Sequence, residues 1–431
     1  MQVLPHKAVA IAVFLLIVGG YAVMALHSPI AYIWATYEDL IGEWAQTWFF
    51  LAATILSVLA AVQETRYRWF FAILALACCY VVLEEISWGQ RIFGFETPEY
   101  LKARNLQGEA NLHNLFTGPH KTFLKDLISV CLALGIFAYG LVYPLMLAKR
   151  WKIASWADRI GVAAPPLFLW PFFTLAASLQ LKPLSCLEAE ISELLIAAAL
   201  AILSLRYVFS FRRNVASPTA QMSRSDSFIF GRWMVLLIVA VVAVSGATTV
   251  AFYSVPENKT RVDNRIENGI EKFAGRYERK NRCDIANELY ALLLEEEPER
   301  VYIMRKMAAC YRDLDRDEEF EDMMSQAIAL DLEKYKADPW RASVNQSLVR
   351  SYRLVGDTER ANAHLAEALE IGTSRIDDHP DSASAAYSYG RTLTLAGRKQ
   401  EAFEQFSRAY EIKPTSSRYR KAYYASRAAL R

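Results

Sequence analysis

Residues 69–93 read WFFAILALACCYVVLEEISWGQRIF, an apolar run that ends in two adjacent carboxylates, Glu84 and Glu85. A charged side chain inside a membrane is costly unless it is paired, hydrated or protonated. Two acids at the end of a membrane-spanning run therefore mark either a functional site or the water interface. If one helix continues through the stretch, Trp88 and Arg91 share a stripe with Glu84, and Arg91 would neutralise that carboxylate.

Apolar and charged residues are separated along the rest of the chain. Of its 431 residues, 54% are hydrophobic and 22% are charged. Apolar runs crowd residues 1–255, whereas the remainder is charged and helix-forming. A net charge of +2 without a long basic run argues against a nucleic-acid partner. We expect an all-α protein, with a polytopic membrane domain at 1–255, a linker at 256–264 and a soluble domain at 265–431.

Seven runs in the first domain are long enough to cross a membrane. Their approximate limits are Lys7–Leu26, Gln46–Val62, Trp69–Leu83, Leu127–Leu147, Val162–Leu181, Leu187–Leu205 and Trp233–Tyr253. The first run also has features of a signal peptide, and its cleavage would leave six spans. Prolines at 165, 166 and 171 predict that the fifth helix is kinked or broken.

The loops that follow the second, fourth and sixth runs carry most of the short-loop arginine and lysine residues. The positive-inside rule assigns such loops to the cytoplasm. The sequence therefore predicts a bacterial inner-membrane protein with a cytoplasmic N-terminus. The acidic and histidine-containing loop 84–120 and the C-terminal domain would then lie on the periplasmic side.

A second acidic cluster opens the sixth run, on the same expected side of the membrane as the first. Glu190 and Glu193 are three residues apart and share one helical face. The loop between the clusters adds Glu109 and His113, which lie one turn apart if the loop is helical and could then serve one metal or one proton-transfer site. The alternative is a structural network in which Arg91, Lys102 or Arg104 pairs with these acids.

These patterns define a set of candidate site residues. The candidates for catalysis are Glu84, Glu85, Glu109, His113, Glu190 and Glu193. The candidates for binding a divalent metal, if the site uses one, are Glu85, His113, Glu190 and Glu193. The candidates for orienting a substrate are Trp88, Gln90, Arg91, Asn111 and Asn114.

The C-terminal part has an internal repeat. Residues 383–414 place small, aromatic and turn-forming residues where two antiparallel helices would interlock, namely Ala386, Tyr389, Gly390, Leu393, Gly397, Ala402, Phe406, Ala409 and Pro414. This pattern resembles the tetratricopeptide repeat (TPR). The start of the second helix recurs at Ala286, Phe320, Ala361 and Ala402, in steps of 34, 41 and 41 residues. The longer steps predict insertions of one to two helical turns near 331–340 and 372–381.

The resemblance implies an α-solenoid of four units that binds peptides or partner proteins in its groove. The tail 417–431 fits a capping helix. Cys283 and Cys310 fall in neighbouring units, so a disulfide between them is an open question. His364 and His379 are expected to be exposed.

Three hypotheses for function follow. The first is a membrane anchor that presents a TPR-type module to envelope proteins or peptides, for assembly or recruitment. The second is a membrane-embedded hydrolase or transferase that acts on lipid or lipid-linked substrates at the acidic and histidine site, with a divalent metal or without a cofactor. A proton-coupled transporter is the weakest, because the helices show no inverted repeat.

Overall fold

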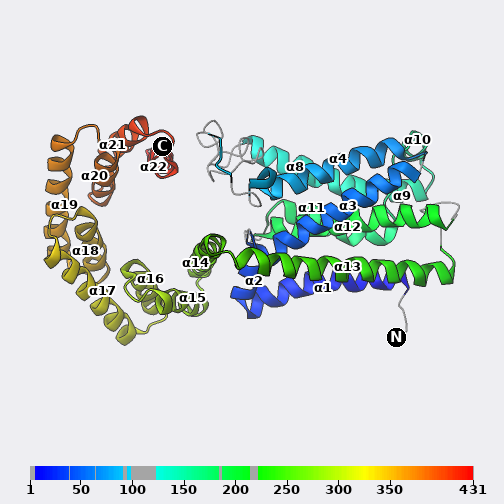
Figure 1. Cartoon of the computed structure of the whole chain (residues 1–431). Coiled ribbons are helices and arrows are strands. Elements are labelled where there is room, and N and C mark those ends of the chain that lie inside the picture. Colours follow the sequence, from blue (N-terminus) through cyan, green and yellow to red (C-terminus); the bar gives the residue numbers. More distant parts are fainter. Residues whose placement is uncertain are drawn as a thin grey trace. The chain divides into compact units, whose positions relative to one another are not determined.

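The computed structural model describes residues 5–37, 39–63, 65–90, 95–98, 123–183, 187–213 and 222–430. Within these ranges every regular element is a helix (Figure 1). Contacts divide the chain into two compact units, and the boundary falls between Gly269 and Ile270. It lies inside helix α14, which runs over Pro256–Arg279. The segment 256–264 is therefore helical, and its expected role as a linker stays a prediction.

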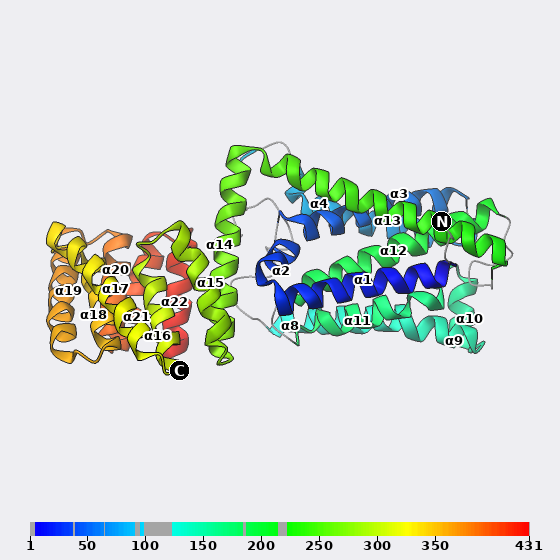
Figure 2. The same ribbon diagram turned by 90° about the horizontal axis from the view of Figure 1, so that it is seen from below.

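The first unit is a bundle whose long helices run side by side (Figure 2). Its helices are α1 (His6–His27), α2 (Pro29–Thr36), α3 (Ile41–Gln63), α4 (Arg68–Glu85), α8 (Phe123–Phe137), α9 (Tyr143–Ala148), α10 (Lys152–Arg159), α11 (Trp170–Gln180), α12 (Glu188–Arg212) and α13 (Arg224–Tyr253). Short turns lie at Ser87–Gly89, Ala138–Val142 and Leu167–Leu169.

Among the described residues, five segments are long and apolar enough to cross a membrane. They are His6–His27, Pro29–Gln63, Asp126–Ala148, Glu188–Arg212 and Arg224–Tyr253. The third expected span corresponds to α4, which has 18 residues but carries Arg68, Glu84 and Glu85. The fifth corresponds to α11, which has only 11 residues. The number of spans therefore stays a prediction.

Helix α12 forms the centre of the bundle. It packs against α3 and α11, and 18 of its 25 residues are buried. Many of these residues are alanines, which allow close helix approach, and Ser204 bonds Ser57 of α3 at 2.9 Å. Large apolar side chains point outward instead, such as Leu16 on α1, Leu76 on α4 and Val239 on α13, which are 74%, 72% and 59% exposed. Small residues inside and large apolar residues outside suit a bundle surrounded by lipid.

The fifth apolar run is broken rather than kinked. Residues 162–166 are not helical, and α11 begins only at Trp170, after a 3₁₀ turn at Leu167–Leu169. Pro165 and Pro166 explain this boundary, because proline lacks the amide hydrogen and disfavours helical geometry in the preceding residue. Pro171 is tolerated because it lies in the first turn of α11, where the amide hydrogen has no helical partner. The helix is thus shorter than the expected Val162–Leu181.

A π-helical turn at Ala138–Val142 brings Gly140 against α11. A Cβ added at Gly140 would lie 2.0 Å from Cβ of Phe173, an atom fixed to the backbone. We expect Gly140→Ala to lower the free energy of unfolding by about 1–3 kcal/mol, measured by thermal unfolding in detergent. The control is Gly135→Ala in α8, where a Cβ meets no atom within 4 Å. Equal destabilisation by both variants would show that the contact with Phe173 is unimportant.

The second unit consists of helix pairs. Its elements are the end of α14, then α15 (Cys283–Glu296), α16 (Val301–Asp313), α17 (Asp317–Ala337), α18 (Ala342–Leu354), α19 (Thr358–Asp378), α20 (Ala383–Leu395), α21 (Lys399–Ile412) and α22 (Ser417–Ala429). We call α14, α16, α18 and α20 the A helices, and α15, α17, α19 and α21 the B helices. Figure 1 shows α16, α18 and α20 along the inner side of a curved array.

The predicted insertions appear as longer B helices. Helices α15 and α21 have 14 residues, whereas α17 and α19 have 21. The seven extra residues equal the difference between the 41- and 34-residue steps and add about two turns. The expected capping helix is α22, which has no fully buried residue.

Candidate functional site

Two of the predicted acids accept hydrogen bonds from the same side-chain amide. Nε2 of Gln46, in α3, donates to Glu85 at the end of α4 over 3.2 Å and to Glu193 near the start of α12 over 2.7 Å. Gln46 is only 1% exposed. Because both carboxylates bond one nitrogen, their oxygens lie within about 6 Å of each other, where like charges repel. The two bonds to Gln46 fit a structural network, and a catalytic role for these acids stays a prediction.

Glu84 has a different environment from Glu85. Its side chain is 5% exposed, and Oε1 accepts a hydrogen bond from Nε1 of Trp88 at 2.6 Å. The expectation that one helix carries Glu84, Trp88 and Arg91 on a stripe is wrong, because α4 ends at Glu85 and Trp88 has a φ of 54°. The indole reaches Glu84 through this turn. Arg91 lies outside the described residues.

The remaining predicted residues divide into two groups. Glu190 lies in the first turn of α12, half-buried, and Gln90 follows the turn after α4 and donates to Thr97 at 2.7 Å. Outside the described residues are Glu109, His113, Asn111 and Asn114. In the part of the chain that the structure describes, no three His, Cys, Asp or Glu side chains are placed to hold a metal ion. The metal site, which includes His113, stays a prediction.

Helix α14 is tied to the first unit by a buried ion pair that the sequence did not predict. Arg265 bonds Asp39, whose side chain is 0% exposed, and the amide of Asp39 bonds the carboxylate of Glu43 at the start of α3. The indole of Trp44 donates to the carbonyl of Asp39 at 3.2 Å. Because Glu43 and Gln46 lie one turn apart, this ion pair adjoins the end of the bundle that carries Glu85 and Glu193.

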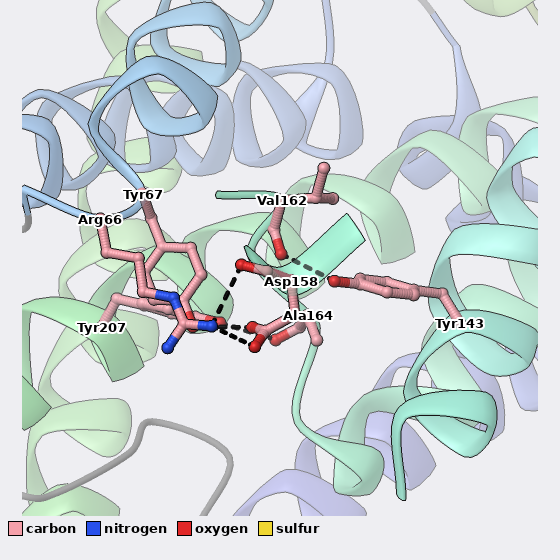
Figure 3. Close-up of polar contacts among 7 residues, drawn as sticks. All are labelled: Arg66, Tyr67, Tyr143, Asp158, Val162, Ala164 and Tyr207. Atoms are coloured by element: carbon pink, nitrogen blue, oxygen red, sulfur yellow. Dashed lines mark hydrogen bonds and ion pairs between the residues drawn. The ribbon is translucent and has the colours of Figure 1, made fainter. Parts of the chain in front are cut away.

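The opposite end of α4 carries a network that supports the broken fifth run (Figure 3). Arg66 pairs with Asp158 of α10, and the hydroxyl of Tyr67 donates to the same carboxylate at 2.8 Å. Carbonyls of the non-helical segment accept bonds from two tyrosines, with Tyr143 donating to Val162 at 2.7 Å and the buried Tyr207 to Ala164 at 3.1 Å. These bonds satisfy backbone groups that the prolines remove from a helix. The network is therefore structural.

The A helices of the second unit are linked by bonds that each span 42 residues. Arg312 donates to the carbonyl of Leu354 at 3.1 Å, and Arg353 donates to that of Leu395 at 2.9 Å. Arg305 likewise donates to the hydroxyl of Ser347 at 2.7 Å. The repetition fixes the offset between successive units.

Charge is divided between the two kinds of helix in this unit. Helices α16, α18 and α20 contain six arginine or lysine residues and one acid, whereas the four B helices contain nineteen acids and six bases. Burial, and then the nearby charges of Arg391, Arg305 and Arg353, lower the pKa of Arg350 to about 10. Within the described residues Asp331 lies 3.6 Å from Arg305, but no carboxylate lies at ion-pair distance from Arg350 or Arg391.

Comparison with known proteins identifies the second unit. The tetratricopeptide repeat model matches residues 363–415, which include most of α19 and all of α20 and α21. The C-terminal unit is a TPR array. No curated protein sequence matches the chain. Among solved structures, a thermophilic TPR protein of Thermus thermophilus is 16% identical, with 45% of this chain and 93% of that chain covered and a TM-score of 0.22. MamA is 18% identical, with coverages of 36% and 84% and a TM-score of 0.18.

His364 lies inside the TPR array, so the expectation that it is exposed is wrong. Its ring stacks on Tyr352 with the planes 3° apart and meets Tyr335 edge-on at a centroid distance of 5.0 Å. Nδ1 lies 2.7 Å from Oδ1 of Asn345, a residue with no exposed surface. Burial lowers the pKa of His364 below its usual value, and Glu367 partly opposes this shift.

A loss of stability at mildly acidic pH follows from the position of His364. The folded array binds the proton less readily than the unfolded chain, so its stability is full above the unfolded pKa of about 6.5 and falls as the pH drops below that value. Hydrogen exchange of α18 and α19 amides at pH 7.5 and 5.5 measures the effect. We expect faster exchange at pH 5.5 after correction for the intrinsic rate, and a smaller difference in His364→Gln. An unchanged difference in that variant would assign the pH dependence to other groups.

Proposed function

We propose that this protein anchors a TPR array at a membrane and that the A-helix face of the array binds an acidic segment of a partner protein. The observation that carries the proposal is the cluster of Arg350, Arg391 and Arg305 on helices whose B-helix partners are acidic. We further propose that the membrane is a bacterial inner membrane, with the array in the periplasm and an envelope protein as its partner.

The membrane part of the proposal is supported by the exposed faces of the first unit. Helices α1 and α13 present large apolar side chains to the surroundings. In the most apolar 18-residue stretch of each helix, only 22% and 11% of the residues are buried, respectively. Such surfaces are typical of lipid-facing helices and would be unfavourable in water. The charge asymmetry of the loops supports the orientation.

Charge complementarity supports an acidic partner. Arginine binds carboxylates through two parallel hydrogen bonds, and mutually repelling guanidinium groups gain most from an added anion. At the start of the array, a cavity of about 330 Å³ is lined by Lys272, Arg276, Arg279 and Lys306 together with the single carboxylate of Glu271. The positive surface therefore continues towards α14.

Binding of labelled peptides to the detergent-purified full chain tests the partner class. We expect a glutamate-rich peptide to bind and a lysine-rich peptide of equal length not to bind. The double variant Arg350→Gln with Arg391→Gln should lose at least about tenfold in affinity, since one or more charge-assisted bonds are removed. It should remain as stable as the wild type, because the substitutions relieve repulsion among arginines.

The matched control is a pair of arginines on a B helix. Arg360 and Arg375 lie on α19, and the side chain of Arg360 is 69% exposed. Changing both to glutamine removes the same total charge from the other side of the array and should leave peptide affinity unchanged. Equal losses of peptide affinity in the two double variants would show that binding depends only on the net charge of the array. That result would overturn the assignment of the A-helix face.

The carboxylate pair at Gln46 favours a second candidate function, proton transfer or hydrolysis on a lipid-type substrate at the outer leaflet. The support is that Gln46 holds the two carboxylates within about 6 Å of each other, where the charge of one affects proton binding by the other. Glu193→Gln keeps the shape of the side chain and removes its charge. If the pair is structural, any loss of function in this variant should be accompanied by a loss of stability, because the bond to Gln46 is disturbed. Loss of function at unchanged stability would favour chemistry at this site.

A further inference from the structure

A cavity in the first unit lies away from the acidic cluster. It has a volume of about 1070 Å³ and is walled by the starts of α1 and α13, by α9, by the segment before α11 and by α12. On α12 the cavity is lined by Arg206. This residue follows Glu193 by thirteen positions, so the two lie about 20 Å apart along the helix. The cavity thus lies at the end of the bundle that the loop charges assign to the cytoplasm.

Three cationic side chains line this cavity. They are Lys7 of α1, Arg206 of α12 and Arg224 of α13, and the described lining contains no aspartate or glutamate. Lys7 and Arg224 are exposed, and neither lies at ion-pair distance from a carboxylate within the described residues. Asp226, the acid nearest to them on α13, bonds Arg213 at 3.1 Å and Ser223 at 2.7 Å. The cavity therefore has a net positive charge that suits an anion.

Arg206 places part of this positive charge in the interior of the bundle. It is 2% exposed, Nη1 donates to Ser210 at 2.6 Å, and its guanidinium lies 5.7 Å from the centroid of the Phe230 ring. A cation held at this depth interacts more strongly with a ligand than one in water, because solvent screening is weak there. Arginine also has the planar donor geometry that matches a phosphate group.

Apart from His6 and Ser227, which bond each other at 2.7 Å, the rest of the wall is apolar, and this favours an amphiphile over a free anion. Its side chains include Leu145, Leu147, Leu167, Phe168 and Trp170. A small hydrated anion would leave this surface without a partner, whereas an acyl chain would cover it. Basic pockets between spanning helices on the cytoplasmic side are known sites for anionic lipid headgroups.

We propose that this cavity binds the phosphate group of an anionic phospholipid through Lys7, Arg206 and Arg224, with an acyl chain against the apolar wall. The proposal rests on the membrane placement in the proposed function, and it is independent of the TPR array. It assigns a lipid site to a part of the chain that the acidic cluster and the array do not use.

Native mass spectrometry of the detergent-purified full chain provides the test, with phosphatidylglycerol, phosphatidylcholine and glycerol 3-phosphate as probes. We expect phosphatidylglycerol to bind more tightly than phosphatidylcholine, and glycerol 3-phosphate to bind at least about tenfold more weakly, since it lacks the acyl chain. Each of Lys7→Gln and Arg224→Gln should weaken phosphatidylglycerol binding by about fivefold. Both residues are exposed, so folding should be preserved.

The control is Arg212→Gln, which removes an exposed cation from the same helix as Arg206 without altering the cavity lining. It should leave lipid affinity unchanged. Equal binding of the two lipids, equal binding of glycerol 3-phosphate, or equal loss in the control would each overturn the proposal. Failure of the wild-type chain to enter phosphatidylcholine vesicles would instead overturn the membrane placement, so the two failures are distinguishable.

Discussion

Arg265→Leu is expected to cost the first unit about 3–5 kcal/mol of unfolding free energy. The substitution removes the guanidinium that bonds Asp39, whose carboxylate is fully buried. A buried ion that loses its counter-ion is strongly destabilising, even where the pair itself contributes little. Because Arg265 lies on α14, the same change should release that helix from the bundle. Thermal unfolding in detergent measures the first effect, and the rate of trypsin cleavage within α14 measures the second.

Two comparisons show whether the ion pair or the helix surface is responsible. Lys259→Leu breaks an exposed pair with Asp263 on the same helix and should change stability little. Asp39→Asn should be milder than Asp39→Ala, because Asp39 has a φ of 65° and asparagine tolerates that conformation better. If Arg265→Leu stays within about 0.5 kcal/mol of wild type, the pair behaves like a surface salt bridge.

The helices could be predicted from the sequence because their signals are local. Apolar runs, the proline break at 165–166 and the repeat steps depend on residues close together in the chain. Helix α14 had such a signal too, since Val262, Ile266, Ile270 and Phe273 recur at intervals of three or four residues. Its proline and charges favoured the interpretation as a linker. Three of these residues, Val262, Ile270 and Phe273, are buried.

The candidate site could be predicted only in part, because it depends on how helices are arranged around the bundle. The acids Glu85 and Glu193 were singled out by their charge in apolar surroundings. Gln46, which joins them, is uncharged and nothing in its local sequence distinguishes it. The turn at Trp88 was missed for a related reason. A tryptophan with a positive φ is rare, and this backbone conformation is imposed by the surrounding structure.

Oxidation of Cys283 and Cys310 is expected to stabilise the start of the TPR array. The two thiols lie on the adjacent helices α15 and α16, with Sγ atoms 2.7 Å apart, and are 2% and 0% exposed. Both are free in the structure. A disulfide between them would close a loop of about 28 residues, for which the chain-entropy model predicts about 3.6 kcal/mol at 25 °C.

The reaction should be slow because both thiols are buried. Burial raises the pKa of Cys283, and burial together with the neighbouring thiol raises that of Cys310 well above its usual value. The reactive species is the thiolate, so little of it is present at neutral pH. With glutathione disulfide as oxidant, the two cysteines lose two electrons and two protons, and the oxidant becomes two glutathione thiols. Oxidation should accelerate with rising pH and in mild denaturant.

Thiol counting and thermal unfolding with and without reductant test this expectation. Oxidised protein should lose two titratable thiols and unfold at a higher temperature, and reductant should reverse both changes. Cys283→Ala with Cys310→Ala should show neither change, whereas Cys78→Ala, which removes a buried cysteine of α4, should behave as wild type. Absence of a disulfide after prolonged oxidation in mild denaturant would overturn this expectation. A periplasmic location favours the oxidised form, so the state of this pair in cells also bears on the orientation of the chain.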